Sequence, residues 1–266
     1  MIVFDAMEFS FLTSFNSFGL AAGMFLVMLA TFWVGKKLSV RFKTYFVDGF
    51  GPVEGSLLGL LALLLAFTFS MAAARYDSRR QVLIQEVNFI STAILRADLY
   101  EPSEREAFRS DFKEYVEVRI DFHDTGFSEE KVTENLNLSA SISRRIWERA
   151  ARLAQNPQNF IKSSQMIPAL NNMIDVVTTR NAIRHATVPD SILGVLFILC
   201  AVSSFMIGIN RKESKSSMRV VNTIFALMIS SCIFLIIDLD RPMHGLITLE
   251  GMNENLIELR SLFDNP

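Results

Sequence analysis

The sequence predicts an all-α fold: four transmembrane helices, with a helical extramembrane domain inserted between spans 2 and 3. Two observations carry this prediction: apolar residues gather in four blocks, and a long charged stretch with helical spacing separates the second block from the third. The hydrocarbon core of a bilayer is about 30 Å thick, so a spanning helix needs roughly 20 apolar residues. Four blocks come close to that length and lack Asp, Glu, Lys, Arg and His, namely residues 18–34, 55–74, 192–209 and 220–237.

These blocks divide the chain into four segments. Residues 1–74 hold transmembrane helices 1 and 2, and residues 75–188 form the helical extramembrane domain. Residues 189–238 hold transmembrane helices 3 and 4. Residues 239–266 form an amphipathic C-terminal tail that we expect to lie on the membrane surface or on the helical domain.

Helical signals continue through the domain between the spans. The second span is expected to continue as one helix to Leu99 and to end at Pro102. Ser103 and Glu106 have the spacing of a capping box, which predicts that another helix begins there. A later helix carries an apolar stripe that we interpret as packing within a helical bundle. The stripe consists of Met166, Leu170, Met173, Ile174 and Val177.

Charges beside the spans bear on orientation, because short basic loops stay in the cytoplasm. The loops after the first and third spans carry eight basic residues, and six arginines flank the spans on the other side. This balance favours a cytoplasmic location for the two loops and an external location for the termini and the helical domain. The eight are Lys36, Lys37, Arg41, Lys43, Arg211, Lys212, Lys215 and Arg219; the six are Arg75, Arg79, Arg80, Arg180, Arg184 and Arg241.

Composition and motifs exclude several classes of function. A net charge of −2 is atypical of nucleic-acid binders, which show a basic face. His123, His185 and His244 are isolated, so we expect neither a metal site nor a cofactor. No phosphate-binding glycine loop or nucleophile elbow occurs, so no catalytic residue is predicted and the chain is not expected to be an enzyme. The spans also lack the ionisable group of a proton-coupled pump, which leaves a passive pore, an uncharged-path transporter or a scaffold.

Small residues recur along one face of the second span. Such residues let helix backbones approach closely in lipid, where the hydrophobic effect does not drive helices together. The pattern fits packing within one subunit, a contact between subunits, or the lining of a pore. The residues are Gly51, Gly55, Gly59, Ala62, Ala66, Ser70 and Ala74.

Charged residues gather where the second and fourth spans end and shortly before the third begins. We expect Arg75 and Arg80 to pair with nearby carboxylates, because a lone charge at the membrane edge is costly to desolvate. The cluster is interpreted either as an ion-pair clamp that fixes the helices or as a charged vestibule at the mouth of a pore. Its members are Arg75, Asp77, Arg79, Arg80, Glu86, Arg180, Asp238, Asp240 and Arg241.

Several of these segments resemble a known family. In bacterial bestrophins a phenylalanine precedes one arginine by eight positions and another by thirteen, and Phe67, Arg75 and Arg80 have this spacing. The whole chain is similar to a bacterial family of membrane proteins, otherwise of unknown function, called bestrophin-like. The matching segments are residues 75–88, 173–180 and 238–242, with Gly245.

The resemblance implies a function, a site and partners. Bestrophins are pentameric anion channels with four spans per subunit, and apolar residues of the second span form their constriction. By position this nominates Gly59, Leu63 and Phe67 as pore-lining residues. The expected partners are the lipid bilayer, further copies of the chain in a homo-oligomer, and chloride or other small anions; no nucleic acid is expected. The expected location is the bacterial inner membrane.

Two alternatives remain open. The chain could be a non-conducting scaffold that binds protein or lipid partners through its helical domain. The nominated pore-lining residues could likewise pack against neighbouring helices rather than surround a pore. In bestrophins the helical domain lies in the cytoplasm, which is opposite to the orientation that the loop charges favour.

Overall fold

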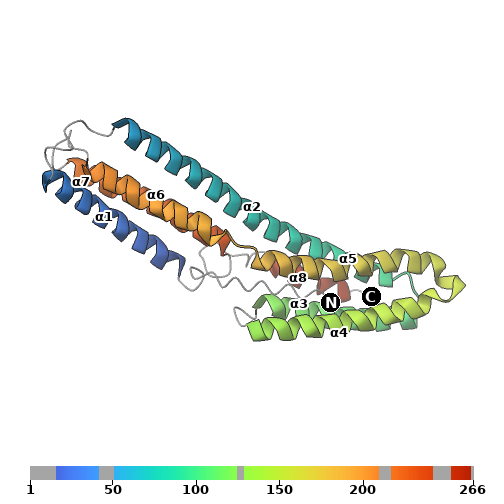
Figure 1. Cartoon of the computed structure of the whole chain (residues 1–266). Coiled ribbons are helices and arrows are strands. Elements are labelled where there is room, and N and C mark those ends of the chain that lie inside the picture. The colour runs from blue at the N-terminus through green and yellow to red at the C-terminus, as the bar shows by residue number, and fades with distance from the viewer. Residues whose placement is uncertain (1–15, 42–50, 125–128, 210–216, 242–252, 265–266) are drawn as a thin grey trace. The chain divides into compact units, whose positions relative to one another are not determined.

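The computed structural model describes residues 16–41, 51–124, 129–209, 217–241 and 253–264. Within these ranges the regular structure is entirely helical (Figure 1). Four helices are long and apolar enough to cross a membrane, so the predicted all-α, four-span fold is confirmed. The elements are α1 (Ser17–Arg41), α2 (Gly51–Ala97), α3 (Pro102–Asp124), α4 (Glu129–Ala154), η2 (Pro157–Asn159), α5 (Phe160–His185), α6 (Asp190–Ile209), α7 (Ser217–Asp240), α8 (Asn253–Glu258) and α9 (Ser261–Asp264).

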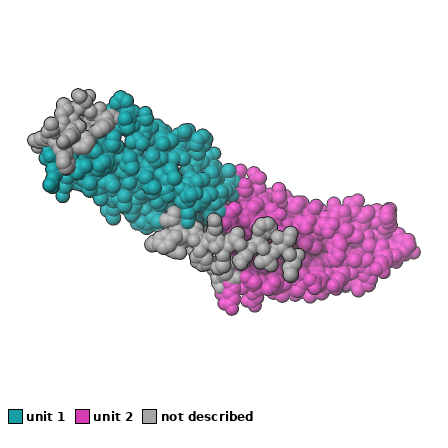
Figure 2. All heavy atoms as spheres, viewed as in Figure 1, with its two compact units in different colours: residues 1–76, 187–247 teal, residues 77–186, 248–266 magenta. Residues whose placement is uncertain are grey.

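The chain forms two compact units (Figure 2). The first, here called the spanning unit, consists of residues 1–76 and 187–247. The second, here called the helical unit, consists of residues 77–186 and 248–266. Helix α2 contributes to both, because it continues without a break past the end of its apolar block.

In the spanning unit, α1 packs against α6 and α7. The backbones of α1 and α6 meet at Gly35 and Gly208. A Cβ atom added to Gly35 would lie 2.3 Å from the carbonyl oxygen of Phe205, and one added to Gly208 would lie 2.3 Å from that of Phe32. The Ser39 hydroxyl donates a hydrogen bond to the carbonyl of Ile209 at 2.9 Å beside this contact. Close packing through small residues therefore holds α1 to α6.

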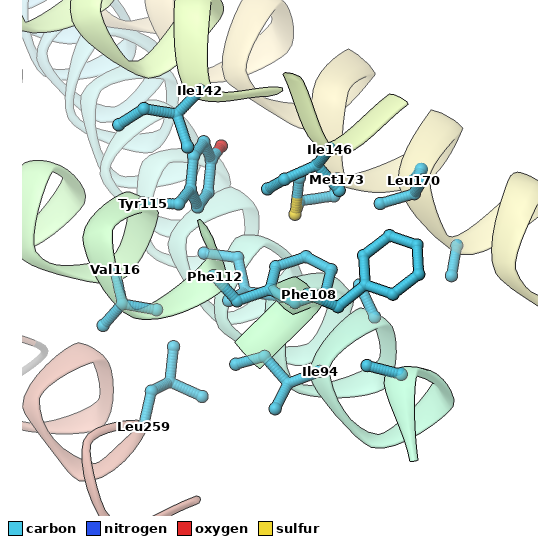
Figure 3. Packing of buried hydrophobic residues seen from close by; sticks show 14 of the residues in the cluster. Ile94, Phe108, Phe112, Tyr115, Val116, Ile142, Ile146, Leu170, Met173 and Leu259 are labelled. Atoms are coloured by element: carbon cyan, nitrogen blue, oxygen red, sulfur yellow. The ribbon is translucent and has the colours of Figure 1, made fainter. Parts of the chain in front are cut away.

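The helical unit has a core of aromatic and aliphatic side chains (Figure 3). Phe108, Phe112 and Tyr115 of α3 are fully buried, because their spacing places them on one face of the helix. The side chains of α2, α4 and α5 surround them, and Leu256 and Leu259 from the C-terminal segment join the same core. The remaining fully buried members are Ile90, Ala93, Ile94, Ala97, Val116, Ile142, Ile146, Ala150, Met166, Leu170 and Met173.

The predicted helix boundaries are close to the observed ones. Helix α3 begins at Pro102, one residue before the predicted Ser103, because proline suits the first turn of a helix, where its missing N–H is not needed. Of the stripe expected on α5, Met166, Leu170 and Met173 are fully buried. Ile174 and Val177 are only partly buried. The neighbouring Val176 is buried instead of Val177.

Candidate functional site

The spanning part of α2 packs through one face and leaves the opposite face open. Leu61, Thr68 and Ala72 are buried against the other helices of the spanning unit. On the opposite face Leu63 is 52% exposed and Phe67 is 62% exposed. Helix geometry explains the division, because Leu61 and Leu63 are two residues apart and so point about 200° away from each other.

Of the four spans, α2 is the least buried within its own chain. In its most apolar 18-residue segment 22% of the residues are buried, against 28% to 44% in the other three. Gly59, the third candidate pore-lining residue, is exposed, and a Cβ atom added there would meet no atom within 4 Å. The three candidates Gly59, Leu63 and Phe67 therefore lie on one open face of the helix.

The small residues of α2 lie beside the same open face. All seven are exposed, from Gly51 through Ala74 at intervals of three or four residues. Added Cβ atoms at Gly51 and Gly55 would also have open space around them. These residues therefore do not form the close helix contacts inside the spanning unit, which Gly35 and Gly208 form instead.

Three members of the predicted charge cluster lie at the end of the fourth span. The buried Asp240 carboxylate accepts the backbone N–H of Val188 through both of its oxygens, at 3.1 and 2.9 Å. Asp238 is also buried, and Arg241 follows directly after α7. Asp240 thus ties the end of α7 to the segment that leads into α6.

The arginines after the spanning part of α2 have different surroundings. The half-buried Arg75 places its Nη2 atom 3.7 Å from the Met71 sulfur. Arg79 is buried and donates a 2.6 Å hydrogen bond to the carbonyl of Ala186, the residue that caps α5. Arg80 is exposed. The exposed Asp77 accepts a hydrogen bond from Gln81 at 3.3 Å.

A buried charge cluster joins three helices of the helical unit. Glu86 of α2 and Arg119 of α3 both have fully buried side chains, and Arg119 Nε lies 2.6 Å from Glu86 Oε1. Arg180 of α5 reaches the other oxygen, with Nη1 2.6 Å from Oε2. Glu86 therefore lies against Arg119 and Arg180 rather than against Arg75 or Arg80. We call Glu86, Arg119 and Arg180 the buried triad.

Electrostatics keep Glu86 ionised. It lies twelve residues beyond the apolar block of α2, in the helical unit outside the membrane-spanning segment. Burial by itself raises the pKa of this carboxyl, but the charges of Arg180 and Arg119 and their hydrogen bonds outweigh that effect and hold the pKa below its ordinary value of 4.5. The triad thus links three helices through one buried carboxylate.

Arg119 was not among the residues that the sequence suggested. A usable signal does exist in α3, where Phe108, Phe112, Tyr115, Arg119 and Phe122 follow one another at intervals of three or four. An arginine inside an apolar stripe of this kind indicates a buried charge with a partner on another helix. The partner itself cannot be identified from the stripe.

Among the described residues, no group of three or more His, Cys, Asp and Glu side chains has an arrangement that could hold a metal ion. Cys200 is buried in the core of the spanning unit and Cys232 is exposed on α7. Pro242 and Gly245, which belong to the segments that carry the resemblance, lie outside the described residues.

Comparison with known proteins adds an independent finding. Residues 19–250 match the profile of a family described as the Bestrophin-like domain. No curated protein matches the sequence. Among solved structures, a bacterial bestrophin homolog from Klebsiella pneumoniae, solved by Zn-SAD phasing, has a TM-score of 0.68 at 15% identity, covering 90% of this chain and 98% of that one.

Two further structures give the same result. A leucine-to-threonine variant of the Klebsiella pneumoniae homolog has a TM-score of 0.68 at 14% identity, covering 90% of this chain and 98% of that one. A serine-to-alanine variant of a membrane protein has a TM-score of 0.69 at 15% identity, covering 92% of this chain and 97% of that one. At such low identity these likenesses show a shared fold.

Proposed function

Because this chain belongs to the bestrophin-like family, we propose that it is a passive channel for small anions such as chloride, assembled from identical copies in the bacterial inner membrane. The observation that carries the proposal is the open face of α2 with Gly59, Leu63 and Phe67. A helix with this face unpacked inside its own subunit is suited to line an axis shared with other copies.

The proposed constriction is an apolar collar. Leu63 and Phe67 are four residues apart, so they follow one another along the same side of the helix. Repeated around an axis, they form a narrow ring that water leaves readily, and ions pass when the ring widens. The small residues beside them, such as Ala66 and Ser70, let neighbouring copies of α2 approach closely.

A positive balance of charge supports anions as the conducted species. Directly after the apolar block, α2 carries the half-buried Arg75 and the exposed Arg80 against the single acid Asp77, while the buried Arg79 donates to the carbonyl of Ala186. Charged side chains at a pore mouth concentrate ions of the opposite sign. Helix periodicity places Arg75 about 120° around α2 from Leu63. We therefore assign the attraction of anions to the positive residues after the apolar block together rather than to Arg75 alone.

The assembly is tested by the subunit number. Particle imaging of the full chain purified in detergent should show a ring with α2 nearest to the central axis, and five copies is the number that the resemblance to bestrophins implies. A monomer or a dimer would contradict the proposal. That result would favour the alternative function, a non-conducting scaffold that binds protein or lipid through the helical unit.

A further inference from the structure

The buried triad of the helical unit has an unbalanced charge. It holds one carboxylate, Glu86, and two guanidinium groups, Arg119 and Arg180. The pKa of Glu86 is held below its ordinary value, so the carboxylate is ionised and the triad has a formal charge of +1. Glu86 and Arg119 are fully buried, and an excess charge away from water is costly unless another group balances it.

Arg119 also has hydrogen-bond donors left over. Its Nε–H donates to Glu86, but its Nη1 and Nη2 atoms are buried and have no hydrogen-bond partner. The ring of Phe122 lies 4.6 Å from the centre of the Arg119 guanidinium and 5.1 Å from that of Arg180. A ring stabilises the flat face of a guanidinium, whereas the N–H groups point outward in its plane, so the ring does not replace the missing acceptor.

Tyr115 adds one more donor beside Arg119. It lies one helical turn earlier on the same face of α3 and is fully buried. Its hydroxyl forms no hydrogen bond of good geometry; the Ser143 hydroxyl is close enough to lower the pKa of Tyr115 by hydrogen bonding, but it donates its own proton to the carbonyl of Ser139 at 2.7 Å. Burial raises the pKa of Tyr115 to about 12, so the hydroxyl keeps its proton at neutral pH and can donate it to an acceptor. Arg119 is the charge that acts most strongly on this hydroxyl.

These features share one chemical requirement. The two Nη groups of Arg119 lack acceptors, the Tyr115 phenol has a poorly formed contact with Ser143, and the charge of the triad is positive. We propose that a small monovalent anion of the size of chloride binds beside Arg119 in the helical unit, accepting hydrogen bonds from Arg119 Nη1 and Nη2 and from the Tyr115 hydroxyl. Because the donors are buried, the site suits a bare halide rather than a lipid headgroup or a larger phosphate. The site does not depend on whether the chain conducts ions.

The test is the thermal midpoint of the full chain in detergent, measured in sodium chloride and in sodium gluconate at one fixed ionic strength. A ligand that binds the folded state raises the midpoint with concentration, so the wild-type protein should be more stable in chloride. Titration of gluconate with chloride then gives an apparent affinity. An equal midpoint in the two salts would overturn the proposal.

Two tyrosine variants test whether the stabilisation by chloride depends on the proposed site. Tyr115→Phe removes one donor and should weaken the apparent chloride affinity about tenfold or more, as for a hydrogen bond to a charged group. Tyr100→Phe is the matched control, because Tyr100 is also buried in the helical unit but its hydroxyl already lies 3.2 Å from that of Ser163. The apparent chloride affinity of the Tyr100→Phe variant should equal that of the wild type. Equal losses in the two variants would contradict the site.

Arg119→Met provides a second and independent check. It removes the excess charge and both unpartnered Nη groups, and it leaves Glu86 paired with Arg180. The difference between the midpoints in chloride and gluconate should disappear in this variant. A chloride effect that survives unchanged in Arg119→Met would assign the anion to another part of the protein, such as the proposed pore, and would overturn the inference.

Discussion

Glu86→Gln should lower the free energy of unfolding of the full chain by about 3–5 kcal/mol, the usual effect of removing one partner from a buried ion pair. The substitution keeps the shape of the side chain but leaves the buried guanidinium of Arg119 and that of Arg180 without a counter-charge. Because the triad joins α2, α3 and α5, its loss weakens the whole helical unit. Denaturant unfolding in detergent measures the effect.

Glu114→Gln is the matched control for this prediction. Glu114 also pairs with an arginine of the helical unit, Arg145, but the two side chains are 51% and 46% exposed. Exposed pairs contribute below about 1 kcal/mol, so this variant should unfold almost like the wild type. Similar free energies of unfolding for the Glu86 and Glu114 variants would show that the triad does not stabilise the unit.

The contribution of Glu86 also depends on pH, and the sign follows from its lowered pKa. A carboxyl whose pKa is lower in the folded state stabilises the fold at pH values above its unfolded pKa. The contribution is lost as the pH falls through the folded-state value, which lies below 4.5. The difference in stability between wild type and Glu86→Gln should therefore be full at neutral pH and shrink in acid.

Phe67→Ala and Leu63→Ala should each raise anion flux several-fold in reconstituted vesicles. Both substitutions widen the proposed collar and reduce the apolar side-chain surface that lines it, so water and ions enter it more readily. The control is Phe69→Ala, since Phe69 is 45% exposed on the same helix but points about 200° away from Phe67. Its flux should match that of the wild type.

Leu65 is a less suitable control than Phe69. It lies about 200° around the helix from Leu63, and it packs against both apolar clusters of the spanning unit. Leu65→Ala would therefore remove buried packing and lower stability, which would confound the comparison of flux. Equal flux from wild type, Phe67→Ala and Leu63→Ala would mean that these side chains do not form the constriction.

Much of the fold could be predicted from the sequence, because its signals are local. Each span is a continuous apolar block, and each helix of the helical unit has its own apolar stripe and end signals. The packed face of α2 was harder to predict. Its spanning part is apolar on all sides, so the pattern alone does not show that Leu61 faces inward and Leu63 outward.

The contacts that could not be predicted join residues far apart in the chain. Gly35 and Gly208 form the close contact of α1 with α6, yet neither stands in a run of small residues as long as the run on α2. Glu86 was expected at the membrane edge, but its partners Arg119 and Arg180 come from two other helices. Pairings of this kind depend on tertiary packing, for which one sequence carries no signal.

We propose that this bestrophin-like chain conducts anions, and chloride efflux from vesicles that contain the purified, unmodified protein tests this claim. Chloride should leave vesicles with the protein faster than it leaves protein-free vesicles, and under the same gradient potassium should leave more slowly than chloride. Efflux no faster than from protein-free vesicles, under conditions in which a known channel conducts, would contradict the claim and leave the scaffold as the function.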